Sequence, residues 1–301
     1  MKQKKKKQGF YPKNKKNWKA YIWFLPSIIL LLMFVIVPVG QVFRMAFSQV
    51  SRSNLILSFG TFENFTYLFQ QSEFGTVMLN TVIWTISIVV VSLVLSLVTA
   101  LVLNERFRGR RLARTILLLP WATSLLITSA AWKYILDHHY GYLNSILLHL
   151  GLIKEEINFL GTPQSAMFWM IVVGIVVTIP FMAFTLLSGL QSIPEDLYEA
   201  AEIDGAGWWT KLFRVTIPLL RPSINVTIVL NVIYVFNSFA IIDTITNGAP
   251  ARLTHTITTY LYFLAFKDHK YGASAALSLV SFAVLTVFSI LYMRLLMKEE
   301  N

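Results

Sequence analysis

Residues 74–104 read FGTVMLNTVIWTISIVVVSLVLSLVTALVLN and contain no Asp, Glu, Lys or Arg. A helix that crosses the hydrocarbon core of a bilayer needs about 20 predominantly apolar residues. This stretch is longer than that; one such stretch could still be a buried core helix, but six of them in 301 residues argue against that alternative. The stretch therefore predicts a membrane-spanning helix over about 76–103.

The same absence of charge recurs along the chain. Further uncharged stretches cover 20–43, 115–132, 157–194, 222–242 and 271–293. Charged residues make up only 14% of the 301 residues, whereas a soluble domain has roughly a quarter. We therefore expect an all-α membrane protein rather than a soluble enzyme. Its six transmembrane helices should cover about 20–43, 76–103, 114–134, 166–190, 222–243 and 271–295.

The distribution of basic residues predicts the orientation, because Lys and Arg concentrate in cytoplasmic loops. If the N-terminus is cytoplasmic and six spans alternate, 19 of the 26 basic residues lie on the inside. Both termini should then be cytoplasmic. Residues 1–19 should form a basic tail, and residues 20–301 a six-helix transmembrane domain. The net charge of +11 is mostly a sign of membrane association. Anionic lipid attracts the Lys residues just before the first span at about 1 kcal/mol each, and we expect no nucleic-acid binding.

The longest cytoplasmic segment, 191–221, has its own helical signals. Ser192 is followed three residues later by Glu195, the spacing of a capping box. Residues 193–203 are good helix formers, and Gly205 is a plausible end for that helix. These signals predict a short helix outside the membrane.

A second short helix, Trp208–Val215, should end before Pro218, which lacks the N–H that a helix interior requires. The segment is thus predicted to be a helix-turn-helix. Its small residues, Ala200 and Ala201, would let another protein's backbone approach closely. The alternative is a helix that lies on the lipid surface.

The spacing of this segment resembles a known motif. Glu199-Ala200-Ala201, three residues, Gly205, nine residues and then Val215-Thr216-Ile217-Pro218 is similar to the EAA motif of bacterial ABC importer permeases. The resemblance extends over nearly the whole chain and is strongest to the carbohydrate group that includes the maltose permease. The supporting segments are Phe62–Phe65, Phe107–Arg110, Leu118–Ala122, Thr246–Pro250, Tyr260–Tyr262 and Ala265–Phe266.

The resemblance implies a permease subunit of the bacterial inner membrane that imports a sugar, namely a di- or oligosaccharide. Its partners would be a second, different permease, two ATPase subunits that bind ATP and Mg²⁺, and an extracytoplasmic sugar-binding protein. The EAA helix would dock into the ATPase, with Glu199 as a polar contact and Ala200 and Ala201 packed closely. Gly205 would form the turn. Asp204 and Pro218 complete the expected coupling set.

The sequence itself offers no site for catalysis. A phosphate-binding loop needs Gly-Lys followed by Ser or Thr, and none of the 14 glycines precedes a Lys. No Gly-x-Ser-x-Gly elbow is present either. We therefore expect no enzyme activity and no cofactor in this chain. Asp137, His138 and His139 adjoin one another, but neighbours on a helix point apart, so we expect no metal site.

A sugar pathway needs polar partners and an aromatic face inside the membrane. The spans offer Asn80, Trp84, Trp121, Thr178, Asn225, Asn231, Tyr234, Asn237 and Ser238. Each could instead make helix–helix hydrogen bonds or packing contacts. The resemblance to the maltose permease implies a pathway at Trp121, Gly174, Thr178, Asn231, Val235 and Ser238. Trp121 would stack on a sugar ring, while Asn231 and Ser238 would bind hydroxyls.

Two other functions compete with import. An ion-coupled secondary transporter would place ionisable residues within its spans, and only Asp243 lies near one. A non-transporting membrane scaffold could use the 191–221 helix merely to bind a partner. The sequence favours the ABC importer permease over both.

Overall fold

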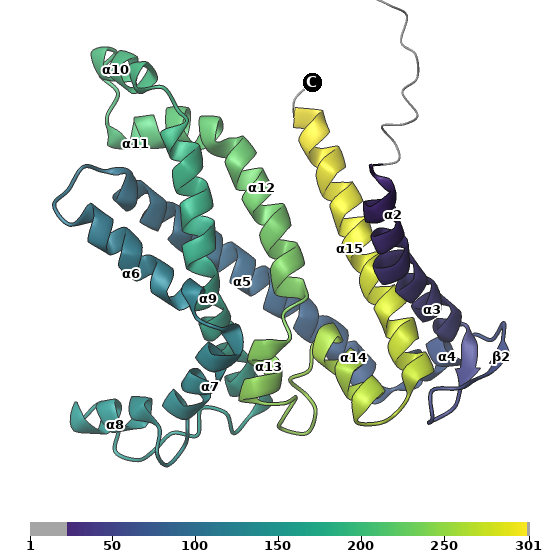
Figure 1. Ribbon diagram of the computed structural model, residues 1–301. Coiled ribbons are helices and arrows are strands. Elements are labelled where there is room, and N and C mark those ends of the chain that lie inside the picture. The colour runs from purple at the N-terminus through teal and green to yellow at the C-terminus, as the bar shows by residue number, and fades with distance from the viewer. Residues whose placement is uncertain (1–22, 300–301) are drawn as a thin grey trace, which may run out of the picture.

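The computed structural model describes residues 23–299, so the predicted basic tail, 1–19, lies outside the described residues. The described chain is mostly helical, and its long helices run between two ends of the molecule, with α10 and α11 at one end and α8 at the other (Figure 1). Among residues 23–299, five helices are long and apolar enough to cross a membrane, or up to six if one bent pair counts as a single span. This confirms the predicted fold class.

The first span, Leu25–Ala46, contains α2 (Leu25–Leu31), a π-helical turn (Leu32–Ile36) and α3 (Val37–Ala46). It extends past the predicted end at residue 43. The π turn lies directly before Pro38, which cannot donate a backbone hydrogen bond. The wider turn shifts the hydrogen-bond register there, as the Val37 N–H bond to the Leu32 carbonyl shows, so the helix continues through the proline.

The segment after this span holds a short antiparallel hairpin, β1 (Ser48–Val50) and β2 (Ile56–Phe59), which the sequence did not predict. It is followed by α4 (Glu63–Gln70). Asn64 of α4 donates hydrogen bonds to the carbonyl oxygens of Met45, Ala46 and Ser48, at 3.3, 3.0 and 2.8 Å. These carbonyls are freed where α3 ends, so Asn64 joins α4 to the end of the first span.

Helix α5 (Ser72–Asn104) packs lengthwise on α9 (Pro163–Gln191) at the centre of the fold. Gly174 makes this contact possible, because a Cβ atom there would lie 2.4 Å from Cδ1 of Ile88. The Ser96 hydroxyl donates to the Ile179 carbonyl at 3.1 Å across the same contact. Small residues and hydroxyl groups at close helix contacts are typical of membrane proteins.

The predicted third span, 114–134, is not one continuous helix. The chain forms α6 (Arg110–Ala122) and α7 (Leu125–Ile135), which are bent by 92° at residues 123–124. Pro120 lies inside the last turn of α6, where it removes a helix hydrogen bond. The Thr123 hydroxyl donates to the Pro120 carbonyl at 2.9 Å, which satisfies a carbonyl left free by the break. Beyond the break lies the short helix α8 (Tyr142–His149).

The second short helix of the 191–221 segment also differs from its prediction. Helix α10 (Glu195–Ile203) is separate, but α11 (Trp208–Lys211) continues through a π-helical turn (Leu212–Thr216) into α12 (Ile217–Phe236). It does not end before Pro218. The Ile217 N–H bonds to the Leu212 carbonyl, five residues back, so the missing N–H of Pro218 interrupts nothing. The fifth span is therefore longer than predicted, over Trp208–Ile245, and includes α13 (Ala240–Ile245) after a break.

The segment that follows α13 contains α14 (Ile257–Phe266), and the chain ends with α15 (Tyr271–Glu299). Asn80 of α5 anchors this segment by donating to the carbonyls of Leu253 and His255, at 2.7 and 3.1 Å. Apolar side chains of α14, α15 and α5 form one of the buried clusters of the described chain. Asn80 thus has a structural role, one of the alternatives that its sequence position left open.

His255 is buried in this segment beside Gly248, and burial together with the charge of Arg252 lowers its pKa to about 4. The folded protein therefore favours the neutral ring, whereas an unfolded His titrates near 6.5. The unfolded state binds more protons between these values, so stability should fall as the pH drops from 6.5 towards 4, by roughly 3 kcal/mol. Thermal melts of the purified protein across this range should show the loss.

The variant His255→Gln should flatten this pH dependence, whatever its effect at pH 7. His269→Gln is the matched control, because His269 is exposed. An unchanged pH slope in His255→Gln would contradict the prediction.

Candidate functional site

Helix α10 begins differently from the predicted capping box. Pro194 is the N-cap residue, and no side chain caps the helix. The Ser192 hydroxyl donates instead to the Gly189 carbonyl at 2.7 Å, at the end of α9. Ser192 therefore belongs to the preceding helix. Glu195 and Asp196 still lie in the first turn of α10, where they interact favourably with the helix dipole.

The end of α10 is a tight turn that requires glycine. Gly205 has a φ of 76°, as predicted for the residue that ends this helix. Its N–H bonds to the Glu202 carbonyl, and the Ala206 N–H bonds to the Ala201 carbonyl, both at 2.9 Å. These are the two hydrogen bonds of a Schellman motif, in which a side chain at the left-handed position costs about 1–2 kcal/mol. The turn between α10 and α11 is thus fixed by the backbone.

Polar contacts hold α10 against the rest of the chain. The Tyr198 hydroxyl lies 3.2 Å from that of Thr216, and the Lys211 ammonium lies 2.5 Å from the Glu202 carboxylate. The hydrogen bond from Lys211 lowers the pKa of Glu202. A third pair, Arg106 with Glu195 at 3.2 Å, is exposed on both sides and adds little.

The remaining face of α10 is free. Glu199, Ala200 and Asp204 are exposed, and Glu199 has no ion pair or side-chain hydrogen bond within residues 23–299. Ile203 is 87% exposed, and Leu197, Trp208 and Trp209 of the two short helices α10 and α11 are exposed as well. Exposed apolar residues that are rimmed by polar ones mark interaction sites. Figure 1 shows α10 projecting beyond the ends of α5, α6 and α9.

A groove separates α10 from the α5–α6 turn. Its walls are largely polar and carry charges of both signs, with Glu195, Glu199 and Glu202 on one side and Arg106 and Arg110 on the other. Arg110 is itself fixed by donating to the carbonyls at the end of α5. Sequence reasoning missed this opposing basic turn, although it singled out Phe107–Arg110 as part of the resemblance.

Four of the six predicted pathway residues lie together. Gly174 and Thr178 of α9, with Val235 of α12 and Ser238 just beyond it, line a small pocket of about 10 Å³ beside the break between α12 and α13. The same pocket is also lined by two aromatic residues from the wider list of polar and aromatic candidates, Trp84 and Tyr234. Unwound backbone between two half-helices is a frequent location for transport sites.

The other two pathway residues do not line this pocket. Trp121 lies at the end of α6, where its ring stacks on that of Phe181 with 6.4 Å between centroids, and it is 53% exposed. Asn231 is buried on α12 and donates to the Thr227 carbonyl at 2.8 Å. The structure thus brings neither side chain to the pocket.

Several remaining polar candidates make the helix contacts that were their alternative. Asn225 accepts a hydrogen bond from Tyr292 of α15 at 3.1 Å. Asn237 donates to the Ile233 carbonyl at 2.8 Å, within its own helix. The Trp84 indole N–H donates to the Val235 carbonyl at 2.9 Å, which joins α5 to α12 at the pocket.

Comparisons with known proteins agree with this architecture. A family model described as "Binding-protein-dependent transport system inner membrane component" matches residues 92–298. The chain is 43% identical to a probable ABC transporter permease protein of Brucella abortus, over 93% of this chain and 97% of that protein. It is 35% identical to the trehalose/maltose transport system permease protein MalF of Thermococcus litoralis, over 91% and 92%. A crystal structure of a bacterial alginate ABC transporter, in complex with alginate pentasaccharide-bound periplasmic protein, shares 26% identity and a TM-score of 0.80, over 92% and 93%.

Proposed function

This chain belongs to the family of binding-protein-dependent transport system inner membrane components, and we propose that it is a sugar-carrying permease of an ABC importer that α10 couples to a separate ATPase. The main support is the exposed face of α10, where Glu199 has no ion pair or side-chain hydrogen bond within the described chain. Another face and the end of the helix are held in place by hydrogen bonds and an ion pair. A helix with only a structural role would bury its apolar residues. Here Ile203 is exposed at its tip.

In the coupling step, α10 would lie in a cleft of the ATPase. The side chains of Ala200 and Ala201 are small enough for close backbone contact, and the exposed carboxylate of Glu199 would meet a donor on the ATPase. Asp204 and Gly205 set the turn that follows. Pro218 lies near the start of α12, which continues α11 without a break. A movement of α10 would therefore be transmitted through α11 along the fifth span. ATP and Mg²⁺ would be bound by the ATPase, not by this chain.

The cargo we propose is a di- or oligosaccharide. Support comes from the relatives, which include the trehalose/maltose system permease MalF and the diacetylchitobiose uptake system permease DasB of Streptomyces coelicolor. The pocket at the α12–α13 break supplies the Ser238 hydroxyl and aromatic surface from Tyr234. The Thr178 hydroxyl donates to the Gly174 carbonyl at 2.7 Å, so it could only accept a hydrogen bond from a sugar. Hydrogen-bonding groups beside an aromatic face suit a sugar ring.

Trp121 and Asn231 remain part of the proposed pathway, although neither lines the pocket. Exposed Trp121 lies on α6, away from the pocket lining, and would meet the sugar only where a second permease completes the passage. Asn231 is one helical turn before Val235 and would shape the wall. Gly174 contributes by letting α5 and α9 approach closely.

The assembly we propose has this chain paired with a different permease, two ATPase subunits and one extracytoplasmic sugar-binding protein. The multi-pass chain lies in the inner membrane, with both termini and α10 in the cytoplasm. The bias of Lys and Arg supports this orientation. The alternatives, an ion-coupled transporter or a scaffold, would need neither an ATPase nor a binding protein.

Co-purification tests the assembly. The epitope-tagged chain, extracted from its own membranes in mild detergent, should bring down an ATPase and a second permease of different sequence. A tagged version with Gly205→Val should recover less ATPase, because the substituted turn is strained and α10 is displaced. Recovery of the wild-type chain without any ATPase would contradict the proposal.

A further inference from the structure

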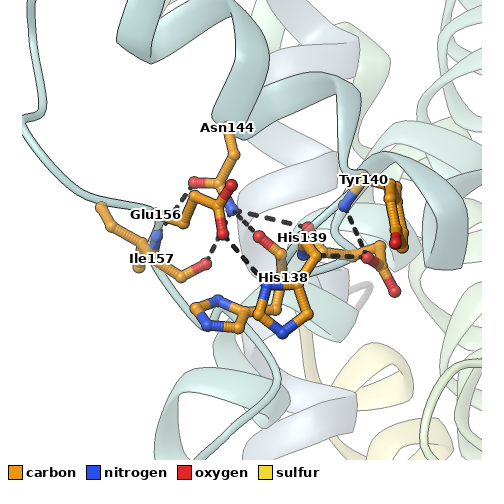
Figure 2. A network of polar contacts seen from close by, with 7 residues as sticks. His138, His139, Tyr140, Asn144, Glu156 and Ile157 are labelled. Carbon is orange, nitrogen blue, oxygen red and sulfur yellow. Dashed lines mark hydrogen bonds and ion pairs between the residues drawn. The ribbon is translucent and has the colours of Figure 1, made fainter.

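At the end of the molecule opposite α10, two histidines and a glutamate converge. His138 and His139 lie in the turn between α7 and α8, and Glu156 lies in the segment between α8 and α9 (Figure 2). One potential ligand atom from each residue lies within 4.8 Å of the other two. The expectation that the histidines point apart assumed a helix. Instead α7 ends at Ile135, and the two rings lie with their centroids 4.3 Å apart.

The distances suit a first-row transition metal. The Nδ1 atom of His139 lies 3.1 Å from Oε2 of Glu156. Two donor atoms bound to one tetrahedral Zn²⁺, with bonds of about 2.0–2.1 Å, are about 3.3 Å apart. Two imidazole nitrogens and one carboxylate oxygen are a ligand set that Zn²⁺ binds, with water as the fourth ligand. The three ligand atoms lie within 4.8 Å of one another, so the side chains must move closer together, the His138 ring by rotation, to bind one ion.

His138 provides an independent observation that points to a ligand. Its Nδ1 atom is buried and has no hydrogen-bond partner among the described residues. A buried polar nitrogen without a partner is costly, at about 1–3 kcal/mol. When one ring nitrogen of a histidine binds a metal, the other normally donates a hydrogen bond to a polar group. Rotation of this ring toward the other two ligands would remove the unsatisfied nitrogen.

The backbone around the three ligands is held by one buried side chain. Asn144 of α8 donates to the carbonyl of His138 and to that of Ile157, both at 2.9 Å, and its Oδ1 accepts the Ile157 N–H at 3.0 Å. It thereby ties the histidine turn to the residue directly after Glu156, as Figure 2 shows. Asn144 is only 1% exposed. Such outer contacts keep metal ligands in position.

A carboxylate beside the turn adds negative charge without being a ligand itself. Asp137 accepts the N–H groups of His139 and Tyr140 at 3.0 and 2.9 Å, so its side chain shapes the turn. A cation placed between the histidine rings would be attracted to it. No Lys or Arg forms an ion pair with Glu156 in the described part of the chain.

We propose that His138, His139 and Glu156 form a site for Zn²⁺, or a similar first-row divalent metal, that clamps the α7–α8 turn to the segment before α9. The metal would join two loop segments that Asn144 already aligns. The site is far from α10 along the chain and is independent of ATPase coupling. Mg²⁺ and Ca²⁺ should bind poorly, because they prefer ligand sets made of oxygen atoms.

The test is equilibrium dialysis of the intact detergent-solubilised complex against ⁶⁵Zn²⁺, after removal of metals by EDTA. The complex must be purified without a polyhistidine tag. Wild type should bind one more Zn²⁺ per copy of this chain than a complex carrying His138→Asn and His139→Asn. The single variants His139→Asn and Glu156→Gln should weaken binding by at least about tenfold. His149→Asn, on α8 with its ring bonded to the Ser145 carbonyl, is the matched control and should bind as wild type does.

A second measurement separates metal binding from misfolding. Co²⁺ in a site with nitrogen ligands absorbs visible light, so Co²⁺ added to the wild-type complex should give a saturable spectrum that Zn²⁺ displaces and the double variant lacks. The double variant without metal should still unfold in one cooperative transition, as wild type does. Equal Zn²⁺ binding by wild type and double variant, or binding by wild type that does not saturate, would overturn the proposal.

Discussion

Replacing Glu199 by Lys should reduce ATP-dependent uptake by at least about tenfold while the protein still inserts and assembles as a membrane protein. The carboxylate is exposed on α10 and has no ion pair within the described chain, so its loss disturbs no internal contact. In the proposed interface, the new Lys ammonium would face the ATPase group that normally donates to the Glu199 carboxylate, so two donors would oppose each other. Like-charge contacts in an interface cost several kcal/mol, and each 1.4 kcal/mol is a factor of ten. Uptake into proteoliposomes and recovery of ATPase on the tagged chain both measure the effect.

The matched control for this variant is Glu155→Lys. It makes the same charge change at an exposed position on the opposite end of the molecule, between α8 and α9. Its uptake and ATPase recovery should stay close to wild type. If Glu199→Lys were as active as Glu155→Lys, the role of α10 in coupling would be wrong.

Replacing Ser238 by Trp should also lower uptake by at least about tenfold, but for a different reason. Ser238 lines the pocket at the α12–α13 break together with Thr178 and Val235, and an indole there would fill it. A tenfold loss corresponds to only about 1.4 kcal/mol of lost stabilisation in the transport step. ATPase recovery should be unchanged, because Ser238 and α10 lie at different ends of the fifth span.

Asn237→Trp is the control for the size of the new side chain. Asn237 adjoins Ser238 but is exposed and does not line the pocket. Asn237→Trp should keep most of the wild-type uptake, so its uptake should exceed that of Ser238→Trp by about tenfold. Equal loss in both variants would assign the effect to disruption of the helix break, and the pocket would lose its assigned role.

The spans were predictable because a bilayer imposes a length and a composition that any reader of the sequence can apply. Their interruptions were not. Pro120 and Pro218 both lie inside helices, yet one precedes a sharp bend and the other follows a π turn that lets the helix continue. The difference depends on which neighbours satisfy the freed carbonyls, such as the Thr123 hydroxyl. That is a tertiary property, which the local pattern does not contain.

The candidate sites divide in the same way. Gly205 was predictable as a helix end, since few other residues adopt its φ without strain. The resemblance brought together Gly174, Thr178, Val235 and Ser238, although their separation along the chain gives no local signal. It did not predict that Asn231 would bond within its own helix. The convergence of His138 and His139 with Glu156 was missed because the turn after α7 was assumed to be helical.

Transport assays in proteoliposomes test the central claim most directly. The purified complex is reconstituted with ATP and Mg²⁺ enclosed on the α10 side, and labelled maltose, trehalose and larger oligosaccharides are added outside with the complex's own binding protein. Uptake should require both ATP and the binding protein, and an ion gradient alone should drive none. Uptake that follows an ion gradient without ATP would identify a secondary transporter and contradict the account.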